Sequence, residues 1–447
     1  MIKQWTQPIE NAPLILFRIF FGLVFFCESI GSLLTGWAKA NYANVTTNFT
    51  FIGFEWLEFL TNESIYAVFI AMAILSVNII LGAYYRISMT SLFLLWGMVY
   101  LGQKTSYNNH YYLMWLISFV MIFVPANAYA SIDAKRNPKV YSLVAPKWSV
   151  IIFPVMISIV YFYATLAKFY PDWLDATVTK GMFESMKKPA FLETIFHNPT
   201  FHRFIAYMGI VFDGLIIPAL LYKRTRWFAI IASLIFHIFN SITLQIGVFP
   251  YFALAFCIFF FPPEKIRAFF FKKKPKLSQE NIKTVDAKQK TLQYIILPFI
   301  ILQIALPLRH WIIPGDVLFT EEGHRLSWRM MLRNRQGEAI FTVKDLNTGN
   351  SFVFDNTILL TQKQKNRLNT PDVIWQMAQK IKAYYKNQGK EVAVYCTEST
   401  IVINRKSHDR LINPTIDLAS QPWHWFQHET WIVEPTTSDI PSIPRVR

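Results

Sequence analysis

Long apolar stretches separated by short polar ones occupy the first two thirds of the chain. A transmembrane helix needs about 20 mostly apolar residues. The stretches that approach this length are residues 12–34, 64–84, 86–101, 111–130, 148–169, 203–222, 227–245, 248–262 and 291–308. The pattern therefore predicts a mainly α-helical polytopic membrane protein with about nine transmembrane helices.

The first apolar stretch, residues 12–34, lies where a cleavable signal peptide would lie, and the Ala-Lys-Ala sequence at residues 38–40 mimics a cleavage site. The stretch is nevertheless long enough to span a membrane, and it carries Arg18 and Glu28. Charged residues within a span usually face other helices or a cavity. We therefore expect this stretch to be a retained first helix.

Residues 309–447 have the composition of an ordinary soluble domain. Alternating polar and apolar residues flank an Asn-Thr-Gly turn at residues 347–349, which predicts a β-hairpin over residues 337–355. Residues 391–404 are rich in β-branched side chains and predict a further strand.

One helix is also expected in this part of the chain. Thr370-Pro371-Asp372 is typical of a helix start, and helical spacing continues until Gly389, a stop signal. We therefore expect two domains, a transmembrane helical domain at residues 1–308 and a β-rich extracytoplasmic domain at residues 309–447.

The composition supports a membrane protein, because 53% of the residues are hydrophobic and only 16% are charged. A soluble domain has roughly a quarter of its residues charged. The net charge of +16 would suit nucleic-acid binding, but the basic residues lie in short loops between apolar stretches. There they set membrane orientation. We therefore expect membrane lipid, and no nucleic acid, as a partner.

The loop at residues 263–290 is the strongest orientation signal, since cytoplasmic loops are enriched in Lys and Arg. Its basic residues are Lys265, Arg267, Lys272, Lys273, Lys274, Lys276, Lys283, Lys288 and Lys290. If this loop is cytoplasmic, the basic residues at 135–147, at 223–226 and at Arg86 are cytoplasmic too. This predicts a multi-pass protein of the cell (inner) membrane, with a cytoplasmic N-terminus and residues 309–447 outside.

Polar and ionisable residues stand at the ends of several predicted spans, where burying them unpaired costs on the order of several kcal/mol. They are the Lys-Thr-Ser-Tyr-Asn-Asn-His sequence at 104–110, Lys168, His237 with Asn240 and Gln245, and Arg309-His310 followed by Ser-Trp-Arg-Met-Met at 327–331. The spacing of Cys27, Cys257 and Cys396 indicates neither a metal site nor a disulfide framework.

Each polar group also has a purely structural interpretation. Lys168 can be a snorkelling lysine whose amine reaches the headgroups. His237 and Asn240 can form a hydrogen bond between helices, and the loop residues can be interfacial anchors. On the derived orientation, however, all the groups lie toward the outer side. One water-accessible pocket, covered by the C-terminal domain, explains them together, and desolvation in such a pocket makes a lysine a usable base.

Several motifs within these groups match those of a known family. They are Lys104-Thr105-x-x-Asn108-Asn109-His110-x-Tyr112-Leu113, Ala126-Asn127-x-Tyr129-x-Ser131-x-Asp133, Tyr161-Phe162-Tyr163-Ala164 with Lys168 and Asp172-Trp173, His237-x-x-Asn240-Ser241 with Phe249 and Tyr251, Leu306-Pro307-x-x-His310, and Ser327-Trp328-x-Met330-Met331. Together they resemble the vitamin K-dependent gamma-carboxylase family. The resemblance covers most of residues 12–335 and implies an HTTM-like membrane domain.

The resemblance implies a reaction. Reduced vitamin K reacts with oxygen, becomes a strong base and ends as the epoxide, while the base removes a γ-proton from a protein glutamate and carbon dioxide is added there. No metal is needed. By resemblance Lys168 is the base that deprotonates the hydroquinone, and Asn109 and His110 stabilise developing negative charge. The residues that the resemblance implies in binding quinone or substrate are His237, Asn240, Arg309, His310, Trp328, Met330 and Met331.

The chain departs from the family in three places. Ala167 precedes Lys168, where animal members often have a second lysine. Arg333 stands where a family histidine near the glutamate site would fall. The part after the last predicted span is shorter than the propeptide-gripping part of animal members. This length indicates a bacterial homologue, whose quinone would be a menaquinone.

Three functions remain open. The chain can be a menaquinol-dependent oxygenase that carboxylates glutamate in an exported protein, a quinone epoxidase that acts on a different acid, or a quinone- or lipid-binding membrane protein without chemistry. Lys168 with Asn109 and His110 favours a catalyst, because a binding protein needs no base.

Overall fold

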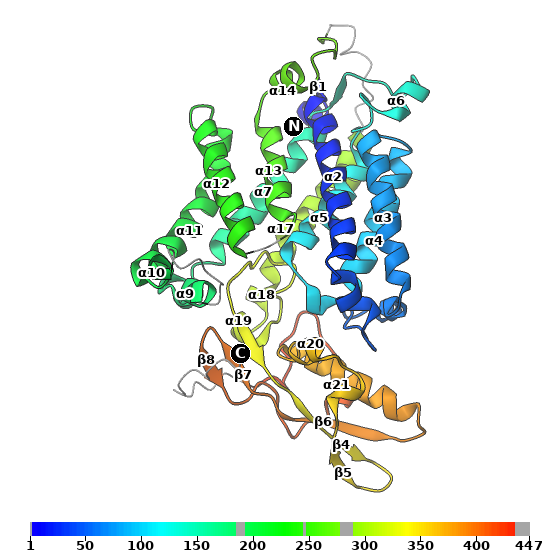
Figure 1. Ribbon diagram of the computed structural model, residues 1–447, viewed down its shortest axis with the longest axis vertical. Helices are drawn as coiled ribbons and strands as arrows, with labels where there is room; N and C mark the ends of the chain where they lie inside the picture. Colours follow the sequence, from blue (N-terminus) through cyan, green and yellow to red (C-terminus); the bar gives the residue numbers. More distant parts are fainter. Residues whose placement is uncertain (1, 185–192, 245–246, 278–288, 434–447) are drawn as a thin grey trace.

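The computed structural model describes residues 2–184, 193–244, 247–277 and 289–433. A bundle of helices makes up most of it, and a smaller region of short strands and helices lies at one end (Figure 1). Three residues that the sequence analysis singled out, Gln245, Lys283 and Lys288, lie outside the described residues.

Each predicted apolar stretch contains a helix. These helices are α2 (Ala12–Leu34), α3 (Ser64–Leu81), α4 (Tyr85–Gly102), α5 (Asn109–Phe123), α7 (Trp148–Leu166), α11 (Pro199–Leu221), α12 (Arg226–Leu244), α13 (Phe249–Ala255) and α17 (Leu297–Ala305). A 3-10 helix prolongs α13 to Phe260. A π-helical turn before α17 and a 3-10 turn after it make that stretch helical over Gln289–Ile312. Within the described chain, six helices are long and apolar enough to cross a membrane.

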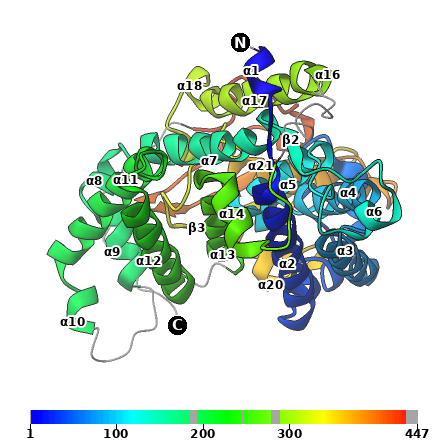
Figure 2. The ribbon, with the colours of Figure 1, turned by 90° about the horizontal axis from the view of Figure 1, so that it is seen from above.

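Short helices connect the long ones. They are α1 (Ile2–Trp5), α6 (Ile132–Arg136), α8 (Pro171–Leu174), α9 (Thr177–Glu184), α10 (Glu193–Phe196), α14 (Pro263–Phe270), α16 (Gln289–Thr291), α18 (Arg309–Ile312) and α19 (Val317–Thr320). Viewed from above, α8 to α12 lie on one side of the bundle and α2 to α4 on the other, with α7 and α13 between them (Figure 2).

The bounds of α5 differ from the predicted stretch for local reasons. The helix begins at Asn109 because the side chain of Asn108 accepts the backbone N–H of Tyr111 at 2.7 Å and so caps the first turn. It ends at Phe123, well before residue 130, because Val124 precedes Pro125 and is extended. This shorter helix leaves Asn109 and His110 in the first turn, next to the loop.

The two charged residues of the first apolar stretch both face the protein interior, as expected for a helix that packs within a bundle. Arg18 of α2 is fully buried and donates to the carbonyls of Ala126 at 3.0 Å and Ala130 at 2.7 Å. Glu28 accepts a hydrogen bond from the Tyr111 hydroxyl at 2.6 Å. Both side chains therefore tie α2 to α5 and to the loop that follows it.

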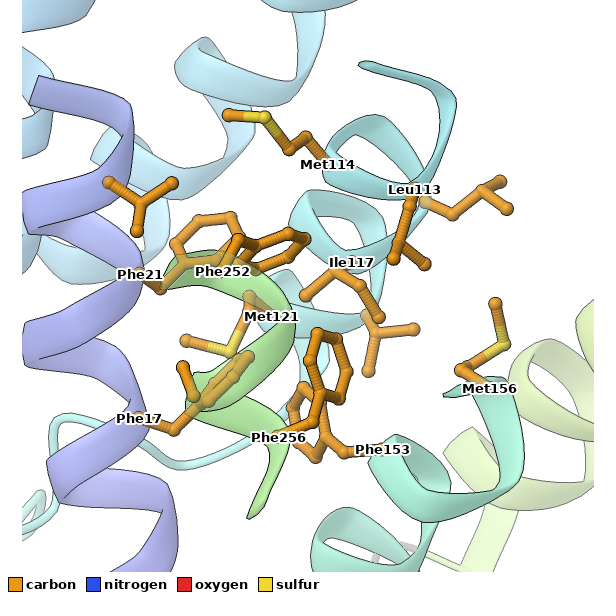
Figure 3. Close-up of a cluster of buried hydrophobic side chains, with 14 of the residues drawn as sticks. Phe17, Phe21, Leu113, Met114, Ile117, Met121, Phe153, Met156, Phe252 and Phe256 are labelled. Carbon is orange, nitrogen blue, oxygen red and sulfur yellow. The ribbon is translucent and has the colours of Figure 1, made fainter. Parts of the chain in front are cut away.

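Aromatic side chains fill the centre of the bundle. Figure 3 shows Phe17 and Phe21 of α2 gathered with Phe252 and Phe256 from the α13 segment and with Phe153 of α7. The ring centroids of Phe17 and Phe153 are 4.7 Å apart, a distance at which aromatic pairs attract. This core holds α7 and α13 against α2.

The two ends of the bundle differ. At one end, a short antiparallel pair joins β1 (Pro8–Glu10) to β2 (Val144–Pro146), and the basic helices α6 and α14 lie nearby (Figure 1). The C-terminal region covers the opposite end (Figure 1). The predicted cytoplasmic loops that include α6 and α14 thus lie at the end of the bundle away from residues 309–433.

The C-terminal region contains two small antiparallel sheets and a long helix. Its strands are β3 (Arg335–Gly337), β4 (Ile340–Asp345), β5 (Ser351–Val353), β6 (Val392–Glu398), β7 (Ile401–Ile403) and β8 (Lys406–His408), arranged as β5-β4-β6 and β3-β7-β8. Its main helices are α20 (Gln362–Lys365) and α21 (Pro371–Lys386). The predicted hairpin is confirmed as β4 and β5, and the predicted helix as α21.

One prediction for this region needs correction. The stretch 391–404 is not a single strand, because it divides between β6 and β7, which belong to different sheets. The Ser399 hydroxyl accepts the backbone N–H groups of Leu411 and Ile412 at 3.0 and 2.9 Å, so the chain between the two strands is held in a turn. A pattern of β-branched residues does not reveal where one strand ends and the next begins.

The C-terminal region is attached to loops between the long helices. Lys104 pairs with Asp372 of α21 at 2.8 Å, and the Gln376 side chain donates to the carbonyl of Thr50 at 3.1 Å. Lys380 pairs with Glu58 at 2.5 Å. These contacts hold α21 across the end of the bundle.

Candidate functional site

The loop between α4 and α5 forms one wall of the candidate site. Lys104 is buried in a single 3-10 turn and pairs with Asp372. Burial lowers the pKa of Lys104 to about 8, while Asp372 acts in the opposite direction. Asn109 and His110 follow as the first residues of α5, with Asn109 only 8% exposed.

The opposite wall is the segment 321–333, which has an unusual backbone. Glu321, Leu326, Trp328 and Met331 all have positive φ, at 61°, 66°, 56° and 56°. Such conformations are uncommon for residues other than glycine, and they concentrate at functional sites. The cluster of outliers therefore favours a functional role for this segment.

A cavity of about 470 Å³ lies between the two walls. It brings together Asn109, His110, Met330 and Met331, four of the residues singled out from the sequence. Its other lining residues are Lys104, Thr105, Tyr107, Asn108, Val178, Met182, His324, Arg325, Arg329, Arg333, Asn334, Arg335, Arg367, Asn369, Thr370 and Val373.

The cavity is strongly cationic, because Lys104 and several arginines line it and no Asp or Glu is among its described lining residues. Two buried carboxylates behind the wall neutralise part of this charge. Arg333 forms a two-pronged pair with Glu321, and Arg325 pairs with Asp372 at 2.6 Å. The surplus positive charge favours an anionic ligand.

Buried donor atoms without a partner support the same conclusion. Within the described chain, Arg329 Nε and Arg335 Nη2 are buried and have no hydrogen-bond acceptor. Buried polar atoms in proteins are almost always hydrogen-bonded, so these two guanidinium groups retain unused hydrogen-bonding capacity. Both atoms belong to cavity-lining residues.

The pKa shifts of the wall residues follow from these charges. Burial opposes ionisation of Glu321, but the positive charges of Arg333 and Arg335 outweigh it and lower the pKa of Glu321 to about 2. Burial and Arg333 together hold the pKa of His324 well below its usual range. His324, 4% exposed, is therefore neutral, and its buried Nδ1 has no partner among the described residues.

Lys168 lies just past the end of α7 and is buried. Its Nζ is 2.6 Å from Asp213 Oδ2 of α11 and also donates to the carbonyl of Ala164 at 3.2 Å. Gly209, one turn before Asp213, lies beside this pair, and a Cβ there would meet the ring of Trp173 at 3.3 Å. The amine thus faces a neighbouring helix, and it does not reach outward as a snorkelling lysine would.

His237 and His110 both contact the ring of Phe249. The ring of Phe249 stacks on His110 at 3.7 Å and meets the ring of His237 edge-on at 6.1 Å. His237 Nε2 is 3.2 Å from the Tyr161 hydroxyl, and Asn240 is half-buried one turn further along α12. Within the described chain, Nδ1 of each of these histidines is buried without a partner.

The remaining predicted residues contact the segment 321–333 or belong to it. His310 Nδ1 is 2.7 Å from the carbonyl of Pro307, and Nε2 is 3.3 Å from Arg329. Arg309 donates to the carbonyl of Arg325 at 3.1 Å. Trp328 is buried in the main apolar core. The 470 Å³ cavity thus brings Asn109, His110, Met330 and Met331 together, but Lys168, His237, Asn240, Arg309, His310 and Trp328 are not among its lining residues.

Sequence reasoning missed two residues of this neighbourhood, Asp213 and His324, and gave Tyr161 no role of its own within its motif. Asp213 had a usable signal, because it is a carboxylate inside the apolar stretch 203–222. His324 had none, since its partners are set by the folded chain. In the described part of the chain, no three His, Cys, Asp or Glu side chains are placed to hold a metal ion.

The long apolar helices define a multi-pass membrane protein, and a lumenal-type domain follows them. Residues 6–264 match the model of the HTTM domain, and residues 288–438 match that of the vitamin K-dependent gamma-carboxylase, lumenal domain. The chain therefore belongs to the vitamin K-dependent gamma-carboxylase family, as its motifs predicted. Membership implies the use of vitamin K. No solved structure matches the chain.

Proposed function

We propose that the protein is a menaquinol-dependent oxygenase that forms the quinone epoxide and couples this reaction to γ-carboxylation of glutamate in an exported protein. One observation carries the proposal: Asn109 and His110 line the same cavity as a surplus of arginines. The balance is quinol, oxygen, carbon dioxide and glutamate on one side, and epoxide, water and γ-carboxyglutamate on the other.

The residues around Phe249 fit a quinone ring. The stacked rings of Phe249 and His110 offer an apolar edge, and the unpartnered Nδ1 atoms of His110 and His237 would bond to the two ring oxygens. Met330 and Met331 add apolar surface that adapts to an irregular ligand. When bound, the reduced quinone supplies the electrons for oxygen and the strong base for the acceptor.

Lys168 would start the reaction by taking a proton from the quinol. To do so it must first be a free amine, and Asp213 Oδ2, at 2.6 Å, is the nearest acceptor for its extra proton. Asn109 and His110 would then stabilise negative charge through hydrogen bonds aimed into the cavity.

The cationic wall would hold the acceptor carboxylate. Arg329 and Arg335 each have one buried donor atom without a partner among the described residues, whereas Arg333 is held by Glu321 through two atoms, and Arg335 Nη1 also lies 3.6 Å from Glu321. A guanidinium binds a carboxylate with two parallel hydrogen bonds, which would fix the glutamate side chain. Removal of its γ-proton then takes place beside positive charge.

The membrane arrangement that we propose has about nine spans, with the N-terminus in the cytoplasm and residues 309–447 outside the cell (inner) membrane. The transmembrane domain would comprise residues 1–308, and the extracytoplasmic domain would comprise residues 309–447. The support is that α6 and α14, which carry basic loop residues, lie at the end away from the C-terminal region (Figure 1). An exported protein could then reach the cationic cavity.

The test is an assay of purified protein with reduced menaquinone and oxygen. Epoxide should form, Lys168→Ala should abolish it, and Lys180→Ala, which removes an exposed lysine of α9, should leave it unchanged. A wild type that binds the quinone and forms no epoxide would make a non-catalytic binding protein the better description. Epoxide without carboxylation of added glutamate peptides, with bicarbonate present, would favour an epoxidase that acts on another acid.

A further inference from the structure

Tyr107 stands at a position that the shared motif leaves open, yet its side chain touches both walls of the cavity. Its hydroxyl is 2.8 Å from Asn109 Oδ1 on the α5 side. The same hydroxyl is 2.9 Å from the backbone nitrogen of Leu326 on the opposite side. One oxygen atom therefore connects the loop before α5 to the segment that carries Arg329, Met330 and Met331.

The direction of these hydrogen bonds follows from elementary chemistry. A backbone N–H can only donate, so the Tyr107 oxygen accepts from Leu326. The hydroxyl has one hydrogen of its own, which it donates to Asn109 Oδ1, and the Tyr100 hydroxyl also lies close to it. Asn109 must then present its carbonyl oxygen to Tyr107, because its NH₂ group cannot accept that hydrogen.

The other neighbour of Asn109 gives the same orientation independently. The Asn109 Nδ2 atom lies 3.5 Å from the carbonyl of Arg329, which can only accept. The NH₂ group therefore points toward Arg329, which lines the cavity. With the opposite orientation, two oxygens would face each other at Arg329, and the Tyr107 hydroxyl would lose its acceptor on Asn109.

We propose that Tyr107 is a positioning residue, which holds the Asn109 amide so that its NH₂ group donates toward the negative charge formed in the reaction. The inference rests on the proposed function, in which Asn109 stabilises that charge. Burial raises the pKa of Tyr107 to about 12, so the hydroxyl keeps the hydrogen that this role requires. The bond to Leu326 also supports a residue whose φ is 66°.

The experiment is a double-mutant cycle on epoxide formation by the full-length purified protein. Tyr107→Phe should lower kcat about 10-fold, the effect of losing about 1.4 kcal/mol of oriented hydrogen bonding, and leave KM for menaquinol unchanged. In an Asn109→Ala background the same change should have almost no further effect, because there is no amide left to orient.

The matched control is Tyr85→Phe, which also removes one buried tyrosine hydroxyl, bonded at 2.8 Å to the carbonyl of Met121. It should leave kcat unchanged, and thermal unfolding will show whether the two variants lose similar stability. If the reductions in kcat caused by Tyr107→Phe and Asn109→Ala multiplied in the double variant, this inference would be overturned and the proposed function would stand. A Tyr107→Phe variant with the wild-type kcat would have the same consequence. A wild type without epoxidase activity would overturn the proposed function and the inference with it.

Discussion

Lys168 and Asp213 form an ion pair 2.6 Å long, in which each residue is 7% exposed. The two residues come from adjacent helices, Lys168 from the end of α7 and Asp213 from α11. Removing one member of a buried pair leaves an uncompensated charge, which costs about 3–5 kcal/mol. The pair is therefore expected to matter for stability as well as for proton transfer.

Asp213→Ala should lower the thermal unfolding temperature in detergent and reduce epoxide formation. A double variant, Lys168→Met with Asp213→Leu, replaces the pair by apolar side chains and should regain most of the stability. Its epoxidase activity should remain absent, because no base is left. If the double variant formed epoxide at the wild-type rate, Lys168 and Asp213 would be structural residues only.

The Glu321 carboxylate should make the protein sensitive to acid. Its pKa is lowered from 4.5 to about 2, so its ionised form is favoured by folding. The resulting stability is fully present above pH 4.5 and is lost as the pH falls toward about 2. The measurement is the unfolding temperature of wild type and Glu321→Gln between pH 7 and pH 3. The gap between them should narrow below about pH 4.5; a constant gap would mean that the charge of Glu321 contributes nothing.

The cationic wall should bind the acceptor rather than the quinone. Arg329→Ala removes a cavity guanidinium and should raise KM for a glutamate peptide about 10-fold or more, as expected for a lost charge-assisted hydrogen bond. The KM for menaquinol should not change. Arg410→Ala, at an exposed position of the same region, is the matched control. A shift in the menaquinol KM alone would assign Arg329 to the quinone instead.

The proposed orientation can be tested by cysteine labelling in intact cells. In a background without the natural cysteines, Lys390→Cys in the C-terminal region should react with a membrane-impermeant reagent added from outside. Lys273→Cys, which follows α14, should react only after the membrane is opened. If Lys273→Cys reacted from outside and Lys390→Cys reacted only after the membrane was opened, the cavity would lie on the cytoplasmic side. Exported proteins would then be excluded as acceptors.

The apolar stretches and the family were available from the sequence, because hydrophobicity over about 20 residues and short motifs are local properties. The positions of the helices followed from these stretches, and the bounds of α5 changed because Asn108 caps its start and Pro125 follows its end. The hairpin of β4 and β5 followed in the same way from the Asn-Thr-Gly turn.

The tertiary structure decided which of these residues meet. Lys168 and Asp213 are 45 residues apart, and Tyr107 and Leu326 are 219 apart, so no local pattern pairs them. The arginine-lined cavity likewise needs the C-terminal region folded against the loop before α5. Pairing across such separations depends on how whole helices pack and on which buried charges find partners, and these are properties of the assembled chain rather than of any segment.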